Sequence, residues 1–521
     1  MSKNIRLGMI QTAVLMSILT LGSKLLGFIR EMVMANFFGT SYVVDAYVMA
    51  FTILTVLFGG LIAAVSTAYT PIFSRLTETE SLESGEQFTS QVINLLCIIT
   101  ILISIFGILF SDQIVKVLAS GFSGETAALA SFFVKVIFCY IIFSSISAIL
   151  EAYLQYKGIF LPQIICGYFI SICTIIFIII SAYVSYYYLA FGLLTGYLLR
   201  FLAIAYISKK GGYKYRFNLE HGKTVKEIIT LSIPVFIGSY ITYINLFIDK
   251  TLASRLLEGS ISALNYASLL NEMIIGVTIS ILSTIIYPKL AKAHALGEFD
   301  QFNTFVISGL NIIFIIGLPC SLGAMLYSKE IIQLAYERGA FDKMATAMTS
   351  SAFLYYAAGL LFIAANGFII RVYYSIHDMK TPMISGIISV IINIALNLIL
   401  VNFMAHNGLA LATSIAAASN MLILIIFMKI KYQYIKIDEC RNSVVKILLS
   451  TSFSVLPVYL IYRRIVANVD KGIIISLVQF VSVVFISVII YLIWLSIFKI
   501  EEMDLLSNFI NNKLRKKGKR D

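Results

Sequence analysis

The stretch Phe169-Ile-Ser-Ile-Cys-Thr-Ile-Ile-Phe-Ile-Ile-Ile180 lies within a segment, 159–183, that contains no charged side chain. An α-helix of about 20 such residues spans the hydrocarbon core of a bilayer. Similar runs recur along the whole chain, in which 59% of residues are hydrophobic and 13% are charged. A water-soluble fold of this length cannot bury so much apolar surface. The sequence therefore predicts an all-α protein that crosses the membrane many times.

The spacing of the apolar runs predicts about fourteen spanning helices. We expect them at 10–38, 43–73, 88–110, 129–154, 159–183, 188–207, 228–252, 261–286, 302–327, 344–373, 381–403, 409–430, 444–462 and 473–498. Lys and Arg gather at both termini and in the loops after the sixth, eighth and twelfth of these helices. Because basic loops stay inside, we expect both termini to be cytoplasmic in a multi-pass plasma-membrane protein.

Short motifs repeat at an offset of 217–220 residues. The pairs are Phe28-Ile-Arg-Glu31 with Phe247-Ile-Asp-Lys250, Thr70-Pro-Ile-Phe-Ser-Arg75 with Tyr287-Pro-Lys-Leu-Ala-Lys292, and Phe110-Ser-Asp-Gln-Ile114 with Tyr327-Ser-Lys-Glu-Ile331. Each repeat holds six predicted helices, an even number, so the two lobes should share one orientation and face each other. We expect an N-lobe at 1–208, a basic cytoplasmic linker at 209–227, a C-lobe at 228–431, two extra helices at 432–498 and a basic cytoplasmic tail at 499–521.

Two cations, Lys24 and Arg30, interrupt the first predicted helix. A charge at membrane depth costs roughly 3 kcal/mol or more, and persists where it meets a watery cavity, a partner charge or an anionic substrate. An arginine binds phosphate or carboxylate with a planar fork, and a lysine binds as a point charge. These residues favour an anion-attracting cavity wall. The alternative is an internal ion pair with Glu31, Asp45 or Glu272.

The C-terminal half carries a set of oxygen donors. Asp249 lies in the seventh predicted helix, Asn393 and Asn397 lie four residues apart on one face of the eleventh, and Thr413 lies early in the twelfth. Oxygen ligands of this kind suit a hard monovalent cation. The alternative is hydrogen bonding between helices, with charge balance between Asp249 and Lys250.

Two loops, 336–342 and 374–382, carry turn-forming residues. These are Gly339 in the first loop and Pro382 in the second. Asp378 and Thr381 are expected to cap the helix that begins near Pro382. The sequence contains no Walker A loop, GxSxG or HExxH motif, so we expect neither a built-in ATP motor nor a hydrolase. The six cysteines are scattered without a CxxC pair and are expected to be core residues.

Five of these stretches together resemble the MurJ (MviN) family, the lipid II flippases of the MOP exporter superfamily. They are residues 26–31, 38–46, 259–267, 337–342 and 374–382, and the resemblance extends over essentially the whole chain. It implies fourteen helices and no enzymatic step. It implies export of undecaprenyl-pyrophosphate-linked disaccharide pentapeptide, the peptidoglycan precursor, to the outer leaflet by alternating access. The two extra helices would form a groove for the polyprenyl tail.

The resemblance also assigns residues. It places on the family's charged substrate-binding positions Lys24, Arg30, Glu31 and Asp45. It places on a sodium site seen in some members Asp249, Asn393, Asn397 and Thr413, where those members carry an aspartate at the position of Asn397. No other cofactor is implied, and peptidoglycan synthases are conceivable partners.

The sequence departs from the family at two places. Family members often carry an arginine in the second helix and another in the eighth, where this chain has the uncharged stretches 57–61 and 266–270. These differences keep three alternatives open. They are a flippase for another polyprenyl-linked oligosaccharide, a drug or cation antiporter of the MOP superfamily, and a non-transporting scaffold for cell-wall synthases.

Overall fold

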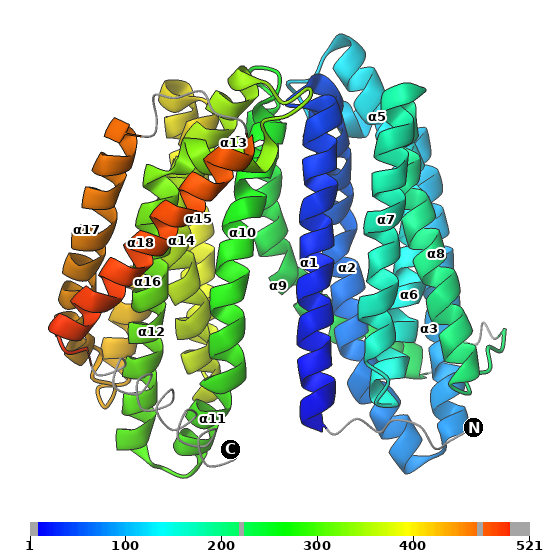
Figure 1. Ribbon diagram of the computed structural model, residues 1–521. Coiled ribbons are helices and arrows are strands. Elements are labelled where there is room, and N and C mark those ends of the chain that lie inside the picture. The colour runs from blue at the N-terminus through cyan, green and yellow to red at the C-terminus, as the bar shows by residue number, and fades with distance from the viewer. Residues whose placement is uncertain (1–8, 218–222, 466–472, 501–521) are drawn as a thin grey trace, which may run out of the picture. The chain divides into compact units, whose positions relative to one another are not determined.

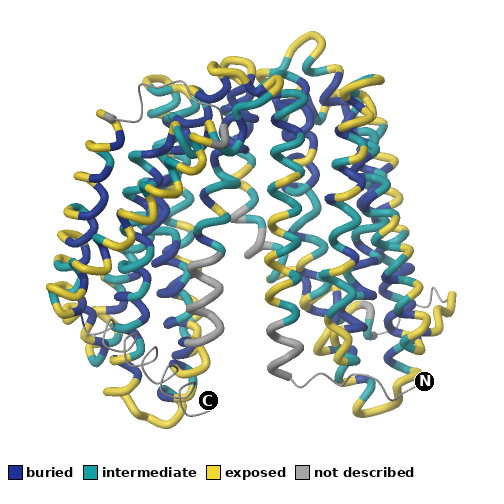
Figure 2. Tube along the Cα trace, in the orientation of Figure 1, coloured by how far each residue is buried: buried dark blue, intermediate teal, exposed yellow. Residues whose placement is uncertain are grey.

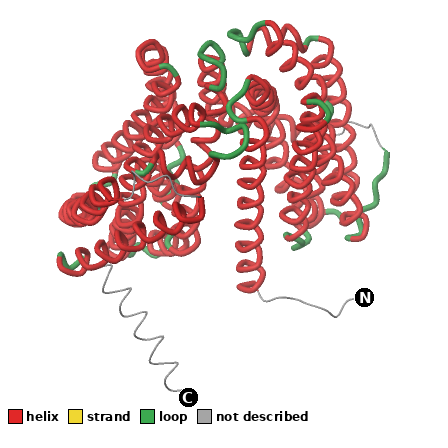
Figure 3. Tube along the Cα trace, turned by 45° about the horizontal axis from the view of Figure 1, so that its top comes forward, coloured by secondary structure: helices red, strands yellow, loops and turns green. Residues whose placement is uncertain are grey.

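The computed structural model describes residues 9–217, 223–465 and 473–500, and these contain helices and turns but no strand (Figure 3). The first helices along the chain are α1 (Met9–Phe38), α2 (Tyr42–Thr79), α3 (Leu82–Leu109), α4 (Ser111–Leu118), α5 (Gly124–Phe138), α6 (Tyr140–Tyr156), α7 (Leu161–Tyr183), η1 (Tyr186–Tyr188), α8 (Leu189–Lys210) and α9 (Lys223–Ala253). They are followed by α10 (Ser260–Ile285), α11 (Tyr287–Ala295), α12 (Phe299–Leu326), α13 (Ser328–Tyr336), α14 (Lys343–Ser375), α15 (Lys380–Met404), α16 (His406–Lys431), η2 (Ile437–Glu439), α17 (Cys440–Ile465) and α18 (Ile473–Ile497) (Figure 1).

The predicted fold class, an all-α polytopic membrane protein, is confirmed. Within the described residues, eleven helical segments are long and apolar enough to span a bilayer. The three remaining predicted spans coincide with α1, α9 and α10, which are 30, 31 and 26 residues long but are not among the eleven. The total of fourteen therefore stays a prediction.

By packing, the chain divides into two compact units. Unit 1 comprises Met1–Asn265 together with Arg338–Ala345, and unit 2 comprises Tyr266–Glu337 together with Thr346–Asp521. This division follows the proximity of backbone positions, whereas the predicted lobes follow sequence repeats, so the lobe boundaries stay a prediction. The predicted tail at 499–521 lies almost entirely outside the described residues, as do positions 218–222 of the predicted linker.

In unit 1 the helix α2 is central, since it packs against α9, α5 and α6 while α1 packs on α7 and α7 on α8. At one end of unit 1 the core is made of aromatic side chains. Tyr69 stacks between Phe73 and Phe88 with ring centroids 5.4 and 5.7 Å apart, and Tyr153 of α6 meets Phe73 edge-on. All four rings are buried. Such pairs add to the free energy of simple burial and fix the register of helices. Figure 2 shows how buried and exposed positions alternate along the trace.

In unit 2 the core joins α12, α14 and α16. Phe302, Phe368 and Tyr373 are buried together, and the Tyr373 hydroxyl donates to the carbonyl of Leu424 at 2.7 Å. The hydrogen bond satisfies a hydroxyl that would otherwise be costly to bury. The last two long helices, α17 and α18, pair with each other, and α17 packs on α12.

The backbone supports the repeat found in the sequence. Phe110, the residue just after α3, has φ −106° and ψ 17°. Its equivalent in the second repeat, Tyr327, lies just after α12 and has φ −101° and ψ 24°. A short helix follows each of them, α4 and α13 respectively. Neither short helix was predicted, because hydropathy marks spanning segments and not the turns between them.

One predicted helix is broken. The segment 129–154 is a single candidate span, but it consists of α5 and α6 with a break at Cys139. The Ser104 hydroxyl donates to the carbonyl of Phe138 at 2.9 Å, which satisfies an acceptor at the break. Gly107 on α3 allows the Phe138 ring to approach closely there. A side chain on a neighbouring helix thus stabilises a break that the local sequence does not announce.

Candidate functional site

Arg30 on α1 forms an ion pair with its neighbour Glu31. Its Nη2 lies 2.7 Å and its Nε 3.1 Å from Glu31 Oε1. The other carboxylate oxygen, Oε2, accepts a hydrogen bond from Asn265 Nδ2 at 3.5 Å. The side chain of Arg30 is 27% exposed and that of Glu31 13%. The ion pair that the alternative reading expected therefore exists, and the Arg30 side chain as a whole is partly exposed.

Lys24 lies on the same helix, six residues before Arg30, and is exposed. At 1.5 Å per residue the two Cα atoms are about 9 Å apart along the helix axis, and their directions diverge by roughly 120°. The two cations therefore do not share one face of α1.

Asp45, the fourth predicted substrate-binding residue, is buried near the start of α2. Its carboxylate accepts hydrogen bonds from the backbone N–H groups of Gly259 and Ser262, each at 2.7 Å. The first N–H groups of a helix have no acceptor within the helix, and Asp45 supplies one for two of them at the start of α10. The helix dipole stabilises the negative charge there further. Asp45 thus caps α10 from a distance of more than 200 residues in the sequence.

The cap is reciprocal. Glu258, just before α10, accepts a hydrogen bond from the backbone N–H of Tyr42, the first residue of α2, at 2.9 Å. Each helix start is therefore satisfied by a carboxylate from the other. The glycine beside Glu258, Gly259, has a φ of +87° and lies against the carbonyl of Thr40, where a side chain would clash.

Two further contacts tie the same end of unit 1 together. The N–H of Ala340, next to the predicted turn glycine Gly339, donates to the carbonyl of Asn36 at 2.8 Å. The N–H of Gly121 donates to Ser254 Oγ at 3.2 Å. In the repeat, Asn36 corresponds to Ser254 and Gly121 to Gly339, so the two contacts lie at corresponding places, with a backbone carbonyl as acceptor in one and a side-chain hydroxyl in the other. Each joins the end of a long helix in one repeat to a turn in the other.

The predicted cation ligands are distributed over both units. In unit 2, Asn397 Nδ2 donates to Asn393 Oδ1 at 2.7 Å, and Asn393 Nδ2 lies 3.5 Å from Thr413 Oγ1. Both asparagines are buried. The first of these hydrogen bonds lies within α15, and the second is the hydrogen bonding between helices, here α15 and α16, that the alternative reading expected. Asp249 lies on α9 in unit 1, so whether the four residues form one site stays a prediction.

In the described part of the chain, no group of three or more His, Cys, Asp or Glu side chains is arranged to hold a metal ion. These four side-chain types are the usual ligands of transition metals, so their dispersion argues against a transition-metal centre in the described residues. Amide and hydroxyl ligands are a separate class, and the amide set on α15 and α16 stays open.

Tyrosines of α9 contact the stretch 57–61 of α2, the place where the resemblance predicts an arginine that this chain lacks. The Tyr240 hydroxyl donates to the carbonyl of Leu57 at 2.8 Å. The Tyr243 hydroxyl lies 2.8 Å from where a Cβ on Gly59 would sit. The ring of Tyr243 therefore lies directly against Gly59, and a long cationic side chain at Gly59 would displace that ring.

The sequence analysis missed a second buried ion pair. Arg200 on α8 contacts Glu151 on α6 through Nε at 2.9 Å and Nη2 at 3.0 Å, with side chains 23% and 12% exposed. Each residue interrupts a predicted span, which is the signal that singled out Lys24 and Arg30. No local pattern pairs them, since they lie 49 residues apart on different helices.

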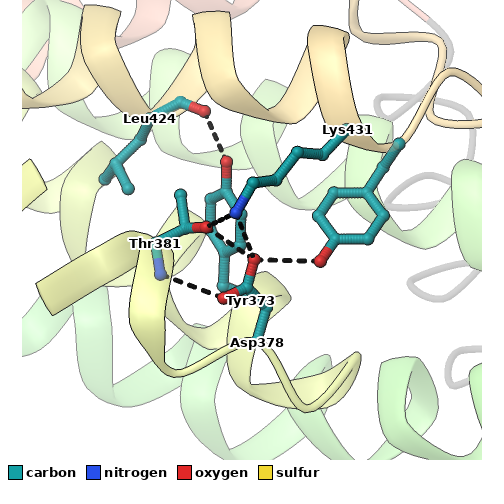
Figure 4. A network of polar contacts seen from close by, with 6 residues as sticks. Tyr373, Asp378, Thr381, Leu424 and Lys431 are labelled. Carbon is teal, nitrogen blue, oxygen red and sulfur yellow. Dashed lines mark hydrogen bonds and ion pairs between the residues drawn. The ribbon is translucent and has the colours of Figure 1, made fainter. Parts of the chain in front are cut away.

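The predicted cap before α15 is confirmed for Asp378, whereas Thr381 lies within the first turn of the helix and is the residue that Asp378 binds. Asp378 accepts hydrogen bonds from the Thr381 N–H at 2.9 Å and from its hydroxyl at 2.6 Å, and Tyr432 and Lys431 complete the network (Figure 4). Burial favours the neutral acid, but the hydrogen bonds from Thr381 and Tyr432 and the charge of Lys431 prevail and lower the pKa of Asp378 to about 2. The network fixes the turn between α14 and α15.

A family model described as "Lipid II flippase MurJ" matches residues 34–482. The chain belongs to the lipid II flippase MurJ family. Two relatives named "Probable lipid II flippase MurJ" show the degree of sequence identity. The protein of Treponema pallidum (strain Nichols) is 28% identical over 87% of this chain and 88% of its own length. That of Rhizobium meliloti (strain 1021) is 30% identical over 78% of each.

Solved structures agree with the MurJ assignment. The structure described as "Lipid II flippase MurJ, inward closed conformation" has a TM-score of 0.80 and 28% identity, and the match covers 95% of this chain and 100% of that one. An inward-facing MATE family transporter of the MOP superfamily has a TM-score of 0.64 at 14% identity over 82% of this chain and 95% of its own, which shows a shared fold. These matches do not report on single residues, so the substrate-binding roles of Lys24, Arg30, Glu31 and Asp45 stay predictions.

Proposed function

We propose that this MurJ family member moves lipid II from the inner to the outer leaflet of a bacterial plasma membrane by alternating access. Lipid II is undecaprenyl-pyrophosphate-linked disaccharide pentapeptide. The observation that carries the proposal is the family match over residues 34–482. A pyrophosphate headgroup does not cross hydrocarbon unaided, because burying an unpaired charge is prohibitively costly. The family to which the chain belongs consists of transporters, and we assign no chemical step to this chain.

Arg30 is the residue we propose to bind the pyrophosphate. A guanidinium has five N–H donors, and Glu31 engages only two of its nitrogens in the structure. The pyrophosphate diester carries two negative charges, one on each phosphate, against one on the Glu31 carboxylate, and an arginine fork binds either group, so the pyrophosphate would compete with Glu31 for Arg30. Glu31 then keeps Asn265 as a partner. Lys24, exposed on the same helix, would add to the attraction at longer range, and Asp45 would act by holding α10.

The driving force we propose is the membrane potential. An inside-negative potential favours outward movement of an anion by about 2.3 kcal/mol per charge per 100 mV. Sodium moving inward would help reset the carrier, bound by Asn393, Asn397 and Thr413 with Asp249. The amide of Asn397 supplies one negative charge less than an aspartate, so sodium binding should be weak. We further propose that both termini are cytoplasmic and that peptidoglycan synthases are partners.

The test is rescue of a bacterium depleted of its own lipid II flippase. Wild type should restore growth, and Arg30→Ala at equal membrane abundance should not. Arg464→Ala is the matched control, because it removes the same side chain from an exposed position at the end of α17.

Two results would contradict parts of the proposal. A wild-type protein that inserts well but does not rescue would indicate a different polyprenyl-linked oligosaccharide as substrate. Rescue by Arg30→Ala at wild-type efficiency would remove Arg30 from the mechanism.

A further inference from the structure

The Glu31 carboxylate in unit 1 is held by two different helices. Its Oε1 accepts hydrogen bonds from Arg30 on α1, from Nη2 at 2.7 Å and from Nε at 3.1 Å. Its Oε2 accepts one from Asn265 Nδ2 on α10 at 3.5 Å. The Glu31 side chain is 13% exposed, against 27% for Arg30. The carboxylate is therefore fixed beside the guanidinium, and the cation is the more accessible of the two.

A carboxylate in this position is a poor ligand for an anion. Glu31 and a pyrophosphate carry charges of the same sign, so they repel each other at short range. The resemblance assigned Glu31 to the substrate-binding set, yet its contacts in the structure are those of a counter-ion of Arg30. Its role in transport therefore belongs to a step in which the substrate is not bound to Arg30.

Such a step exists in any carrier that works by alternating access. After the substrate leaves on one side, the unloaded protein must return through a state that is closed to both sides. A cation without a partner is costly at membrane depth, and removing one partner of a buried pair leaves an uncompensated charge. Because Glu31 is the next residue along α1, the pair can re-form without a bimolecular encounter when the pyrophosphate departs.

The same pair must lower the affinity for the substrate. A pyrophosphate reaches Arg30 only by displacing Glu31, so part of the binding free energy is lost in breaking the pair. Asn265 offers the displaced carboxylate a hydrogen-bond donor, which limits that loss. Removing the charge of Glu31 should therefore have opposite effects on two steps, with tighter binding of substrate and slower return of the unloaded carrier.

We propose that Glu31 is the counter-ion that neutralises Arg30 while the unloaded carrier returns, and that it does not bind the substrate. The inference rests on the proposed role of Arg30 in binding pyrophosphate. The task differs from a reset driven by sodium. Sodium would favour one direction of the return, whereas Glu31 lowers the barrier to it.

The experiment compares net transport with exchange for Glu31→Gln in vesicles that contain lipid II. Net transport requires the unloaded return. Exchange of labelled for unlabelled lipid II between the two leaflets does not, because the carrier is loaded in both directions. We expect net transport to fall by about tenfold, which corresponds to about 1.4 kcal/mol in the barrier, and exchange to fall much less.

A second measurement does not depend on what the protein transports. The affinity of purified Glu31→Gln for inorganic pyrophosphate, measured by calorimetry, should rise because the competing carboxylate is gone. Arg30→Ala should abolish this binding. The double variant Glu31→Gln with Asn265→Asp moves the negative charge across a single contact and should restore part of the net transport.

The matched control is Glu151→Gln. Glu151 pairs with Arg200 elsewhere in unit 1 at 2.9 and 3.0 Å, and the two side chains are 12% and 23% exposed. This variant should keep the wild-type ratio of net transport to exchange and the wild-type affinity for pyrophosphate. If Glu31→Gln does not insert, Glu31→Asp takes its place. Its shorter side chain weakens the pair and should still lower net transport relative to exchange.

The outcomes separate the two proposals. Equal losses of net transport and exchange in a correctly folded Glu31→Gln, or a pyrophosphate affinity that does not rise, would overturn the counter-ion role. Wild type that binds pyrophosphate through Arg30 but does not move lipid II would contradict the proposed substrate alone. The affinity of Glu31→Gln for pyrophosphate would then still decide the counter-ion role.

Discussion

At the scale of single residues, Asp45 shows how a charge in a membrane helix can serve the fold directly. The resemblance placed it on a substrate-binding position, and the structure shows its carboxylate accepting hydrogen bonds from two N–H groups at the start of α10. A carboxylate so engaged has little capacity left for a substrate. Its effect on transport would come through the positions of α2 and α10.

Replacing Asp45 should reveal this structural role. We expect Asp45→Ala to lower the free energy of unfolding by about 2 kcal/mol, at the upper end for loss of a helix cap. Asp45→Asn keeps an acceptor oxygen and should lose less. Thermal unfolding in detergent measures both, with Glu258→Gln as the control for the reciprocal cap. Equal melting temperatures for Asp45→Ala and wild type would show that the cap contributes nothing.

The network around Asp378 should make stability depend on pH. The carboxyl has a pKa of about 2 in the folded protein, against about 3.9 for an ordinary aspartate. Its stabilisation is therefore fully present above pH 4 and is lost as the pH falls toward 2. We expect Asp378→Asn to cost about 1.5 kcal/mol at pH 7. The difference in melting temperature from wild type should shrink as the pH is lowered from 4; a constant difference would contradict the assignment.

Local signals decided which residues could be predicted. Asp378, Thr381 and Pro382 follow one another closely, and a helix cap needs only such neighbours, so the sequence sufficed. The partners of Glu151 and Arg200 lie on different helices, and no local pattern pairs them. The same limit applies to Asp45, because its role depends on the start of a helix more than 200 residues away.

At the scale of elements, the hydropathy pattern located the long helices well, because their length is set by the bilayer. It did not find α4, α11 or α13, which are eight or nine residues long. The break between α5 and α6 was also beyond reach, since its causes lie on α3. The motif repeat predicts the equivalence of these two turns where hydropathy does not, because it aligns Phe110 with Tyr327, the residues at which the turns begin.

The turns after α6 and α14 differ in one telling residue. Gly158 has a φ of +75°, and the equivalent His377 has a φ of +61°, a conformation that glycine adopts with little strain. We expect His377→Gly to stabilise the protein by about 1 kcal/mol. Gly158→Ala should destabilise it through backbone strain alone, because nothing lies within 4 Å of a Cβ there. Melting temperatures shifted in the same direction for both variants would contradict this explanation.

At the scale of the whole molecule, alternating access requires the contacts between the two sequence repeats to open in every cycle. The contact of Asn36 with Ala340 is one of them. In a variant whose six cysteines are replaced, we expect Asn36→Cys with Ala340→Cys to lose transport when joined by a short cleavable crosslinker. Transport should return on cleavage.

The control crosslink lies within one helix. Ser74→Cys with Glu78→Cys joins adjacent turns of α2, whose native side chains are hydrogen bonded at 3.0 Å, and should leave transport intact. Full activity of the crosslinked Asn36–Ala340 pair would show that this end of unit 1 stays closed throughout the cycle.

The membership of Arg338–Ala345 in unit 1 bears on how the protein is made. A ribosome supplies chain from the N-terminus at about 5–20 residues per second, so the first 265 residues enter the membrane several seconds before this segment exists. Until it arrives, the carbonyl of Asn36 lacks the partner it has in the finished protein. The N-terminal part of the chain is therefore assembled early but completed late. An insertase or chaperone that shields the end of α1 would act in that interval.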